Sequence, residues 1–146
     1  MEGGGGFRVT GPFTGINHHG ALGHGNHVRE RAGDGDGSTA GRLVAEMDAR
    51  EDLLTPFGNL HGGCLSALVD HCLGVVFYPL IPKGAWVATT EFKLNLLKPV
   101  SSGTCVATAE VIALTRRSGV ARIDITNDNN AACAAQGTVT IVLPMT

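Results

Sequence analysis

The sequence predicts an α+β domain in which an antiparallel sheet curls around one long helix. Two observations carry this prediction. Residues 62–77 repeat their apolar positions at helical spacing, whereas from residue 87 onward the apolar residues alternate with a period of two. One apolar helix followed by several turn-linked strands favours a sheet wrapped around that helix.

The elements expected before and within the helix follow the same logic. Residues 42–48 alternate apolar and polar side chains, as a half-buried strand does. The helix has an apolar face made by Leu65, Leu68, Val69, Cys72 and Val76. Further apolar residues around it predict that other structure covers the helix on most sides, and prolines at 79 and 82 end it.

Strands are expected at residues 87–98, 105–114, 120–126 and 137–143, with turns at 116–119 and 127–130. Strict alternation along the first of these strands predicts two faces. One face carries Phe92, Leu94 and Leu96, and the other carries Thr89, Glu91, Lys93 and Asn95.

The chain of 146 residues fits one domain. Residues 1–41 are a Gly- and His-rich leader, expected to be partly flexible with a short helix and an irregular edge strand, and residues 42–146 are the folded domain. Four histidines lie in the leader, at His18, His19, His24 and His27. They suggest either a metal site or a flexible leader. We expect the leader and no metal, because no fixed scaffold or acidic partner is evident.

Composition and charge exclude some classes of binding partner and some cellular locations. A formal net charge of −2 argues against nucleic acid. Four cysteines without a CxxC pair predict free thiols in a reducing, cytoplasmic protein. We expect no secretory signal. We also expect no membrane span, since the apolar segment 64–81 is interrupted by Asp70, His71 and Pro79.

The segment 55–70 carries the chemistry. It is a loop that enters the helix through His61, Gly62 and Gly63, followed by the lone carboxylate of Asp70. The free N–H groups at a helix start could stabilise an oxyanion, and glycines allow a ligand to come close. Because an unpaired buried carboxylate is costly, Asp70 either accepts a hydrogen bond from a neighbouring strand or faces a cleft. The residues alone leave these alternatives open.

This segment resembles the Asn-x-x-Gly-x-x-His-Gly-Gly signature of hotdog-fold acyl-CoA thioesterases, of the phenylacetate-degradation and 4-hydroxybenzoyl-CoA type. Gly58, His61, Gly62 and Gly63 match the signature, and Asp70 follows His61 at the spacing of the family's catalytic Asp or Glu. The strand at 89–99 also looks like the family's strand after the helix. The similarity spans about residues 42–143, and it implies the hotdog fold.

The resemblance implies hydrolysis of an acyl-CoA thioester without a metal or other cofactor, coenzyme A being part of the substrate. Asp70 would act as general base or nucleophile, the Gly62 N–H would bind the carbonyl oxygen, and Thr89 would hold water. His61 would orient the site, and Gly63 would contact the substrate. The family also implies a homodimer or homotetramer, with sites where the Gly62 loop of one subunit faces Asp70 and Thr89 of another.

The sequence departs from the family at Thr55, where an Asn or Gln is expected to help polarise the thioester. Asn59, in the same loop, could take that role. The segment Arg116-Arg117-Ser118 has two interpretations: a solvated hairpin turn, or a clamp for the coenzyme A phosphates, which guanidinium groups bind well.

Two other functions compete with the thioesterase. A hotdog dehydratase needs a different His and acidic motif, which the sequence lacks. A non-catalytic acyl-CoA-binding hotdog protein is the alternative that Thr55 favours, although Asp70 and Thr89 together argue for catalysis.

Overall fold

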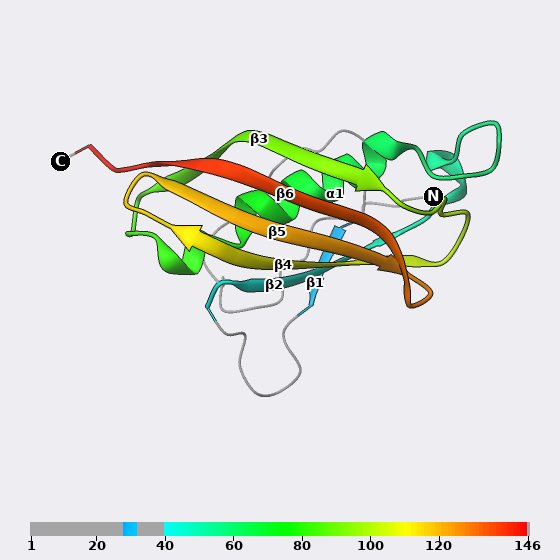
Figure 1. Cartoon of the computed structure of the whole chain (residues 1–146), viewed down its shortest axis with the longest axis horizontal. Coiled ribbons are helices and arrows are strands. Elements are labelled where there is room, and N and C mark those ends of the chain that lie inside the picture. The colour runs from blue at the N-terminus through cyan, green and yellow to red at the C-terminus, as the bar shows by residue number, and fades with distance from the viewer. Residues whose placement is uncertain (1–27, 32–39, 146) are drawn as a thin grey trace, which may run out of the picture.

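The computed structural model describes residues 28–31 and 40–145 of the chain. Within them lies one antiparallel sheet of six strands, in the order β1-β2-β4-β5-β6-β3. The strands are β1 (Val28–Arg31), β2 (Arg42–Asp48), β3 (Trp86–Leu96), β4 (Thr104–Leu114), β5 (Ser118–Asn127) and β6 (Asn130–Val142). The helix α1 (Gly62–Val75) lies across this sheet (Figure 1).

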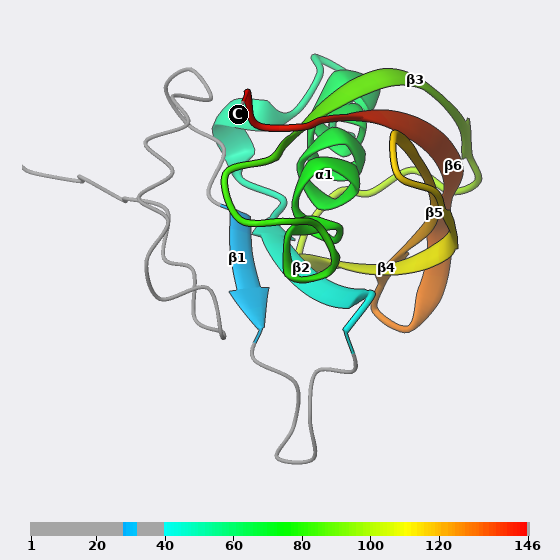
Figure 2. The same ribbon diagram turned by 90° about the vertical axis from the view of Figure 1, so that its left-hand side faces the viewer.

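The sheet curls around α1, as Figure 2 shows in a view along the helix. The predicted fold class, an antiparallel sheet wrapped around one long helix, is confirmed. Although β3 follows α1 in the chain, within residues 28–31 and 40–145 it pairs only with β6 and forms one edge of the sheet. Two short 3-10 helices, η1 (Glu51–Leu53) and η2 (Tyr78–Leu80), flank α1 along the chain.

The predicted strand positions agree with the structure to within about two residues, except at the first residue of β6. The strand expected at 137–143 begins at Asn130, because β6 is paired on both sides, with β5 and with β3. The segment 131–136 is rich in alanine, which has low intrinsic preference for strands, so pairing decides its conformation. The turn before it is tight: Asp128 and Asn129 both have positive φ, as a two-residue hairpin loop requires.

Part of the leader belongs to the sheet. β1 lies within residues 1–41 and pairs with β2 from Val28 opposite Met47 to Arg31 opposite Val44. Residues 1–27 and 32–39 of the leader fall outside the described part of the chain, and His18, His19, His24 and His27 are among them.

The core forms where α1 packs on the concave face of the sheet. The buried residues of α1 are Leu65, Leu68, Val69, Cys72 and Leu73. A glycine in β6 permits this close packing, since a Cβ on Gly137 would lie 2.6 Å from the Leu73 side chain and 2.7 Å from Cβ of Phe92. The strand therefore approaches the helix at a place where any side chain would hold it away.

The other face of α1 is not covered. Gly63 and Asp70 are exposed, and Ser66, Ala67 and Gly74 are partly exposed. The prediction that structure covers the helix on most sides agrees with the burial of α1, in which only Gly63 and Asp70 are exposed, and this face is the exception in a single chain. A helix apolar on nearly all sides, with one side uncovered, is a common feature of proteins that associate.

The helical segment Gly62–Leu80 has the length and apolar composition of a membrane-spanning helix, with a mean hydropathy of 1.5 over its most apolar window. From its sequence, this region is expected to be too short and too polar to span a membrane. By length and composition that expectation is wrong. Core helices of globular proteins share these properties, and the inner face of α1 is packed against the sheet.

Candidate active site

The loop before α1 is held closed by backbone hydrogen bonds. The Thr55 N–H donates to the Asn59 carbonyl at 2.7 Å, and Gly58 turns the chain with a φ of 85°. The Leu60 N–H donates to the Val100 carbonyl at 2.6 Å, which ties the loop to the segment after β3. The position at which α1 begins is therefore fixed from two sides.

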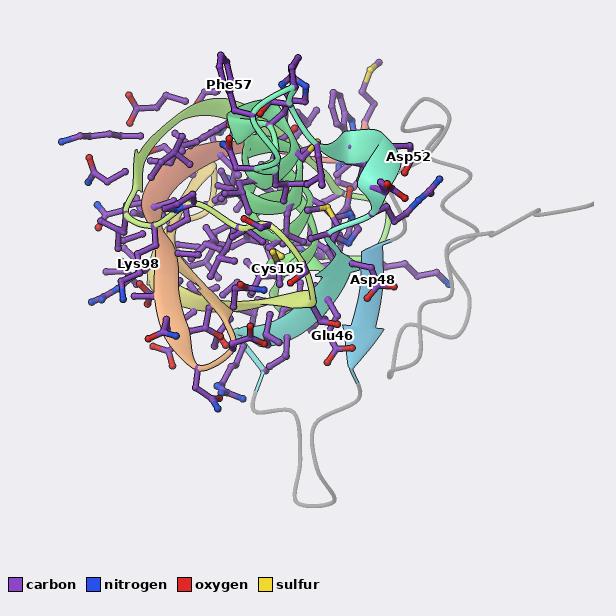
Figure 3. All side chains as sticks on the ribbon, turned by 90° about the vertical axis from the view of Figure 1, so that its right-hand side faces the viewer. Glu46, Asp48, Asp52, Phe57, Lys98 and Cys105 are labelled. Carbon is purple, nitrogen blue, oxygen red and sulfur yellow. The ribbon has the colours of Figure 1, made fainter. Side chains whose placement is uncertain are left out.

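Thr55 and Asn59, both predicted to contact substrate, contact each other. The Thr55 hydroxyl donates to Oδ1 of Asn59 at 3.0 Å and accepts from the Phe57 N–H at 3.2 Å. The hydroxyl is thus used within the loop, whereas the amide nitrogen of Asn59 keeps its two N–H donors. Phe57 stands at the loop tip, 94% exposed, at the end of the molecule where α1 begins (Figure 3).

The sequence predicts an oxyanion site at the start of α1. α1 begins at Gly62, and the exposed His61 precedes it without a side-chain hydrogen bond that caps the helix. The first N–H groups of a helix lack intrahelical acceptors and carry the positive end of its dipole. Gly63 is open to solvent, since a Cβ there would meet no atom within 4 Å.

Asp70 is on the uncovered face of α1. Its side chain is exposed, and no described residue donates a hydrogen bond to it, so the alternative of a bond to a neighbouring strand is not what the structure contains. Asp70 follows Gly62 by eight residues, which corresponds to about 12 Å along a helix. One chain therefore does not bring the Gly62 N–H and the Asp70 carboxylate to the same carbonyl group.

Thr89 lies on the helix side of the sheet because of a β-bulge. The pairing of β3 with β6 shifts between Thr89 and Glu91, which leaves Thr90 as the extra residue. Thr89 pairs with the fully buried Val139, and paired residues share a face. Phe92 also packs against the core. The strict alternation that placed Thr89 opposite Phe92 is therefore wrong, and the bulge turns Thr89 toward the layer that holds α1.

The hairpin between β4 and β5 contains Arg116, Arg117 and Ser118. The Thr115 hydroxyl lies 2.9 Å from the Ser118 hydroxyl and accepts from the Ser118 N–H at 3.0 Å, which closes the turn. Both arginines are exposed, and no carboxylate of the described residues forms an ion pair with either. Their charges are thus available to an anion.

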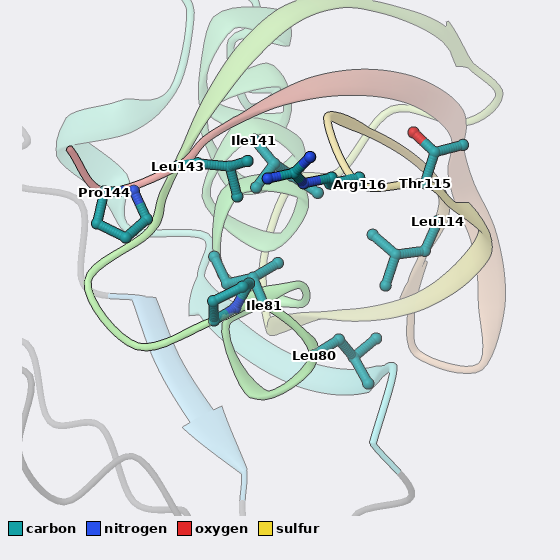
Figure 4. A pocket seen from close by; sticks show the side chains of 9 residues that line it. Leu80, Ile81, Leu114, Thr115, Arg116, Ile141, Leu143 and Pro144 are labelled. Carbon is teal, nitrogen blue, oxygen red and sulfur yellow. The ribbon is translucent and has the colours of Figure 1, made fainter. Parts of the chain in front are cut away.

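Arg116 borders a pocket at the far end of α1 from Gly62 (Figure 4). The pocket has a volume of about 320 Å³, and apolar side chains dominate its lining. Leu80, the last residue of η2, and Ile81 form one wall, and Leu114 of β4 forms another. Arg116 therefore stands beside a hollow at the opposite end of the helix from Gly62.

All four cysteines, Cys64, Cys72, Cys105 and Cys133, are free thiols, as predicted. Burial raises the pKa of Cys105 from 9.0 to about 11, with smaller contributions from Asp48 and Cys64. Burial also raises the pKa of Cys64, which stands two residues after Gly62, so its thiol is a poor nucleophile near neutral pH. Among residues 28–31 and 40–145, no group of three or more His, Cys, Asp or Glu residues could hold a metal ion.

The sequence prediction missed two features of this region: the bulge at Thr90, and a small apolar pocket next to Gly62 bordered by Leu96 and Leu97. The pocket could have been predicted from the sequence, because the adjacent residues Leu96 and Leu97 break the apolar–polar alternation at the end of the strand. The bulge leaves no such signal in the sequence.

Comparisons with known proteins identify the family of the chain. The sequence model of the thioesterase superfamily matches residues 57–134. The proofreading thioesterase EntH of Klebsiella pneumoniae is 31% identical, over 71% of this chain and 76% of that protein. The 1,4-dihydroxy-2-naphthoyl-CoA hydrolase of Listeria monocytogenes is 28% identical, over 69% of this chain and 83% of that protein.

A solved structure shows the same fold. The crystal structure of a thioesterase from Haemophilus influenzae aligns with a TM-score of 0.71 at 29% identity, and covers 79% of this chain and 78% of that one. The chain therefore belongs to the thioesterase superfamily, and the prediction of a hotdog-fold thioesterase is confirmed.

Proposed function

We propose that the protein hydrolyses an acyl-CoA thioester at a site shared between two copies of the chain. The observation that carries this proposal is the Asp70 carboxylate, which is exposed on the uncovered face of an otherwise apolar helix and has no hydrogen-bond donor among the described residues. The hydrolase of Listeria, whose name specifies a CoA thioester, supports coenzyme A as the thiol. The free cysteines support a reducing, cytoplasmic setting.

Two copies are needed because of the distance along α1. Gly62 and Asp70 are about 12 Å apart along one helix, far more than a single carbonyl group spans. The edge strand β3 supplies a way to associate, since the described part of the chain pairs with only one of its sides and leaves a row of backbone groups unpaired along its eleven residues. A two-fold pairing of β3 edges would bring the uncovered faces of two α1 helices together.

In this site the carbonyl oxygen of the thioester accepts a hydrogen bond from the Gly62 N–H of one subunit. Asp70 of the other subunit takes a proton from water as the water oxygen adds to the carbonyl carbon, or its carboxylate adds directly. Thr89 holds the water in the first case. In the first case the C–S bond then breaks, the thiolate takes the proton from Asp70, and the free acid is released. In the second case breaking the C–S bond leaves an anhydride between the acyl group and Asp70, and water hydrolyses this anhydride to the free acid, restores the Asp70 carboxylate and supplies the proton of the thiol. Asn59 supplies a further donor to the carbonyl, and Arg116 and Arg117 bind the phosphates of coenzyme A, with Ser118 beside them.

The alternative is an acyl-CoA-binding protein without activity. It is favoured by Thr55, whose hydroxyl is engaged within its own loop rather than directed at a substrate. The two functions differ in one measurement, the release of free thiol from acyl-CoA.

The first experiment mixes the purified protein with a panel of acyl-CoA thioesters and a thiol-trapping reagent, with and without EDTA. Turnover that is unaffected by EDTA supports a hydrolase that uses no metal. Binding without thiol release would establish the non-catalytic alternative. Loss of turnover with EDTA and its return with a divalent metal would contradict the proposed mechanism.

The second experiment tests the shared site with Gly62→Pro. Gly62 is the first residue of α1, a position where proline is tolerated, and the ψ of 136° at His61 suits a residue before proline. The substitution removes the N–H and keeps the helix. Its control is Gly62→Ala, which keeps the N–H and makes the same new contact, 2.9 Å from the flexible end of Leu96. We expect Gly62→Pro to lose activity and Gly62→Ala to keep most of it.

Mixing then identifies the subunit that supplies each group. If Gly62 and Asp70 act from different subunits, inactive Gly62→Pro and inactive Asp70→Asn form heterodimers with one intact site out of two. After exchange of subunits, an equimolar mixture should regain about a quarter of the wild-type activity. No recovery, despite heterodimers detected by native mass spectrometry, would place both groups in one subunit and contradict the proposal.

A further inference from the structure

A small apolar pocket opens beside the first turn of α1. Its volume is about 130 Å³. Leu60, Leu65 and Val100 form its buried part, and Leu96 and Leu97 form its exposed rim, at the end of β3. Gly62 itself is one of the lining residues. The pocket therefore adjoins the N–H group to which we assign the carbonyl oxygen of the substrate.

The side chain of Leu96 lies directly against Gly62. A Cβ on Gly62 would stand 2.9 Å from Cδ1 of Leu96, so the absence of a side chain at residue 62 is what leaves room for it. Leu96 is 56% exposed, and Leu97 is 51% exposed, which leaves the leucine rim accessible to a ligand. Exposed leucines at the mouth of a pocket are costly in water unless something apolar covers them.

The chemistry of the lining distinguishes the two halves of a thioester. The pantetheine arm of coenzyme A contains amide groups, which lose free energy when they are buried without hydrogen-bond partners. The leucine, valine and proline side chains that form most of the lining offer none, and Lys98 is the one lining residue whose side chain can donate. The backbone N–H groups of Leu60 and Leu97 are already bonded to the carbonyls of Val100 and Ala132. A hydrocarbon group gains free energy from the same surroundings.

The volume limits that hydrocarbon group. A cavity of about 150 Å³ lined by apolar side chains takes up benzene. A pocket of about 130 Å³ therefore has room for a short acyl chain or most of a single ring, and a longer chain must pass the rim formed by Leu96 and Leu97.

We infer that this pocket receives the acyl group of the substrate and that Leu96 sets the largest acyl group the enzyme hydrolyses well. The inference rests on the proposed function, because it takes the Gly62 N–H as the place of the carbonyl oxygen. It adds the substrate class, short-chain or single-ring acyl thioesters, and a residue that determines specificity.

The test compares Leu96→Ala and Leu96→Phe with the wild type on straight-chain acyl-CoA thioesters of increasing length and on benzoyl-CoA. Leu96→Ala enlarges the pocket and should shift the kcat/KM optimum to longer chains. Leu96→Phe fills the pocket and should restrict hydrolysis to the shortest ones. One methylene in an apolar pocket changes kcat/KM by about tenfold or more, so we expect the ratio between long and short substrates to move at least tenfold in opposite directions.

The matched control is Leu114→Ala, an exposed leucine that borders the pocket at the other end of α1. It should leave the chain-length profile unchanged. A wild type that hydrolyses the panel, together with Leu96 variants that keep its length profile, would overturn the inference and leave the proposed function intact. An equal shift with Leu114→Ala would also overturn it.

A binding measurement keeps the inference testable if the wild type hydrolyses nothing, a result that would contradict only the proposed function. Calorimetric titration of the Asp70→Asn variant with the same acyl-CoA series should give an affinity that rises with chain length up to the limit of the pocket. Adding Leu96→Ala to Asp70→Asn should move that limit to longer chains. An affinity independent of the acyl group in both proteins would refute the pocket assignment.

Discussion

Gly119 of β5 lies directly against the ring of Phe77, so closely that a Cβ built on the glycine would overlap the ring. Phe77 is fully buried just after α1, and Gly119 is the second residue of β5, two residues after Arg117. The end of the helix and the start of β5 are thus fitted to each other without space for one methyl group. This contact fixes the hairpin relative to α1.

The first prediction is that Gly119→Ala destabilises the fold. The new methyl group forces Phe77 to move within a packed core, and such overpacking costs about 1–3 kcal/mol. Chemical denaturation should show this loss in the free energy of unfolding. Adding Phe77→Leu to Gly119→Ala should cost less than the sum of the two single changes, because the smaller side chain relieves the overlap. Strict additivity would show that the two residues do not conflict.

The second prediction concerns Asp70. Asp70→Asn keeps the size of the side chain and removes the charge that activates water or attacks the carbonyl, so kcat should fall by at least about a hundredfold. Because the side chain is exposed, the free energy of unfolding should be nearly unchanged. Thr89→Ala should lower kcat less, and Glu110→Gln, at an exposed carboxylate of β4, should have no effect. A folded Asp70→Asn variant with near-normal kcat would contradict the mechanism.

The third prediction concerns the β4–β5 hairpin. Replacing Arg116 and Arg117 by alanine removes two exposed guanidinium groups that have no ion-pair partner among the described residues, so stability should change little. If they bind the phosphates of coenzyme A, KM for acyl-CoA should rise severalfold while kcat is retained. KM for the pantetheine thioester, which lacks the nucleotide, should stay the same. Equal losses on both substrates would exclude a nucleotide clamp.

The fourth prediction concerns pH. The folded protein holds the pKa of Cys105 at about 11, above the ordinary value of 9.0, because burial favours the neutral thiol. Its contribution to stability is therefore complete below about pH 9 and is lost as the pH rises toward 11. The loss is on the order of 2 kcal/mol, since one pKa unit corresponds to about 1.4 kcal/mol.

Urea unfolding of the wild type and of Cys105→Ala across this range measures that loss. The difference between the two free energies of unfolding should shrink as the pH rises from 9 to 11. A constant difference would show that the Cys105 thiol does not ionise on unfolding, and the wild-type decline would then belong to other groups.

The sequence alone determined the elements and their order. Apolar spacing located α1 and the strands from 42 to 143, since a core-facing helix and a half-buried strand each leave a periodic pattern in the chain. The segment 58–63 and Asp70 identified the family, because the helix start and the carboxylate lie close together in the sequence. The early start of β6 could not be read from its alanines, since pairing with two neighbours and not local preference makes that segment a strand.

Only the tertiary structure decided how these residues meet. The bulge at Thr90 rotates Thr89 to the helix side, an effect of pairing between strands far apart in the chain that leaves no periodic signal. The contact of Leu96 with Gly62 likewise joins residues from two different elements. The exposure of Asp70 depends on which face of α1 the curled sheet covers, and the sheet reaches only one of them. Periodicity reports that a residue is apolar or polar, whereas its neighbours across the fold decide what it can do.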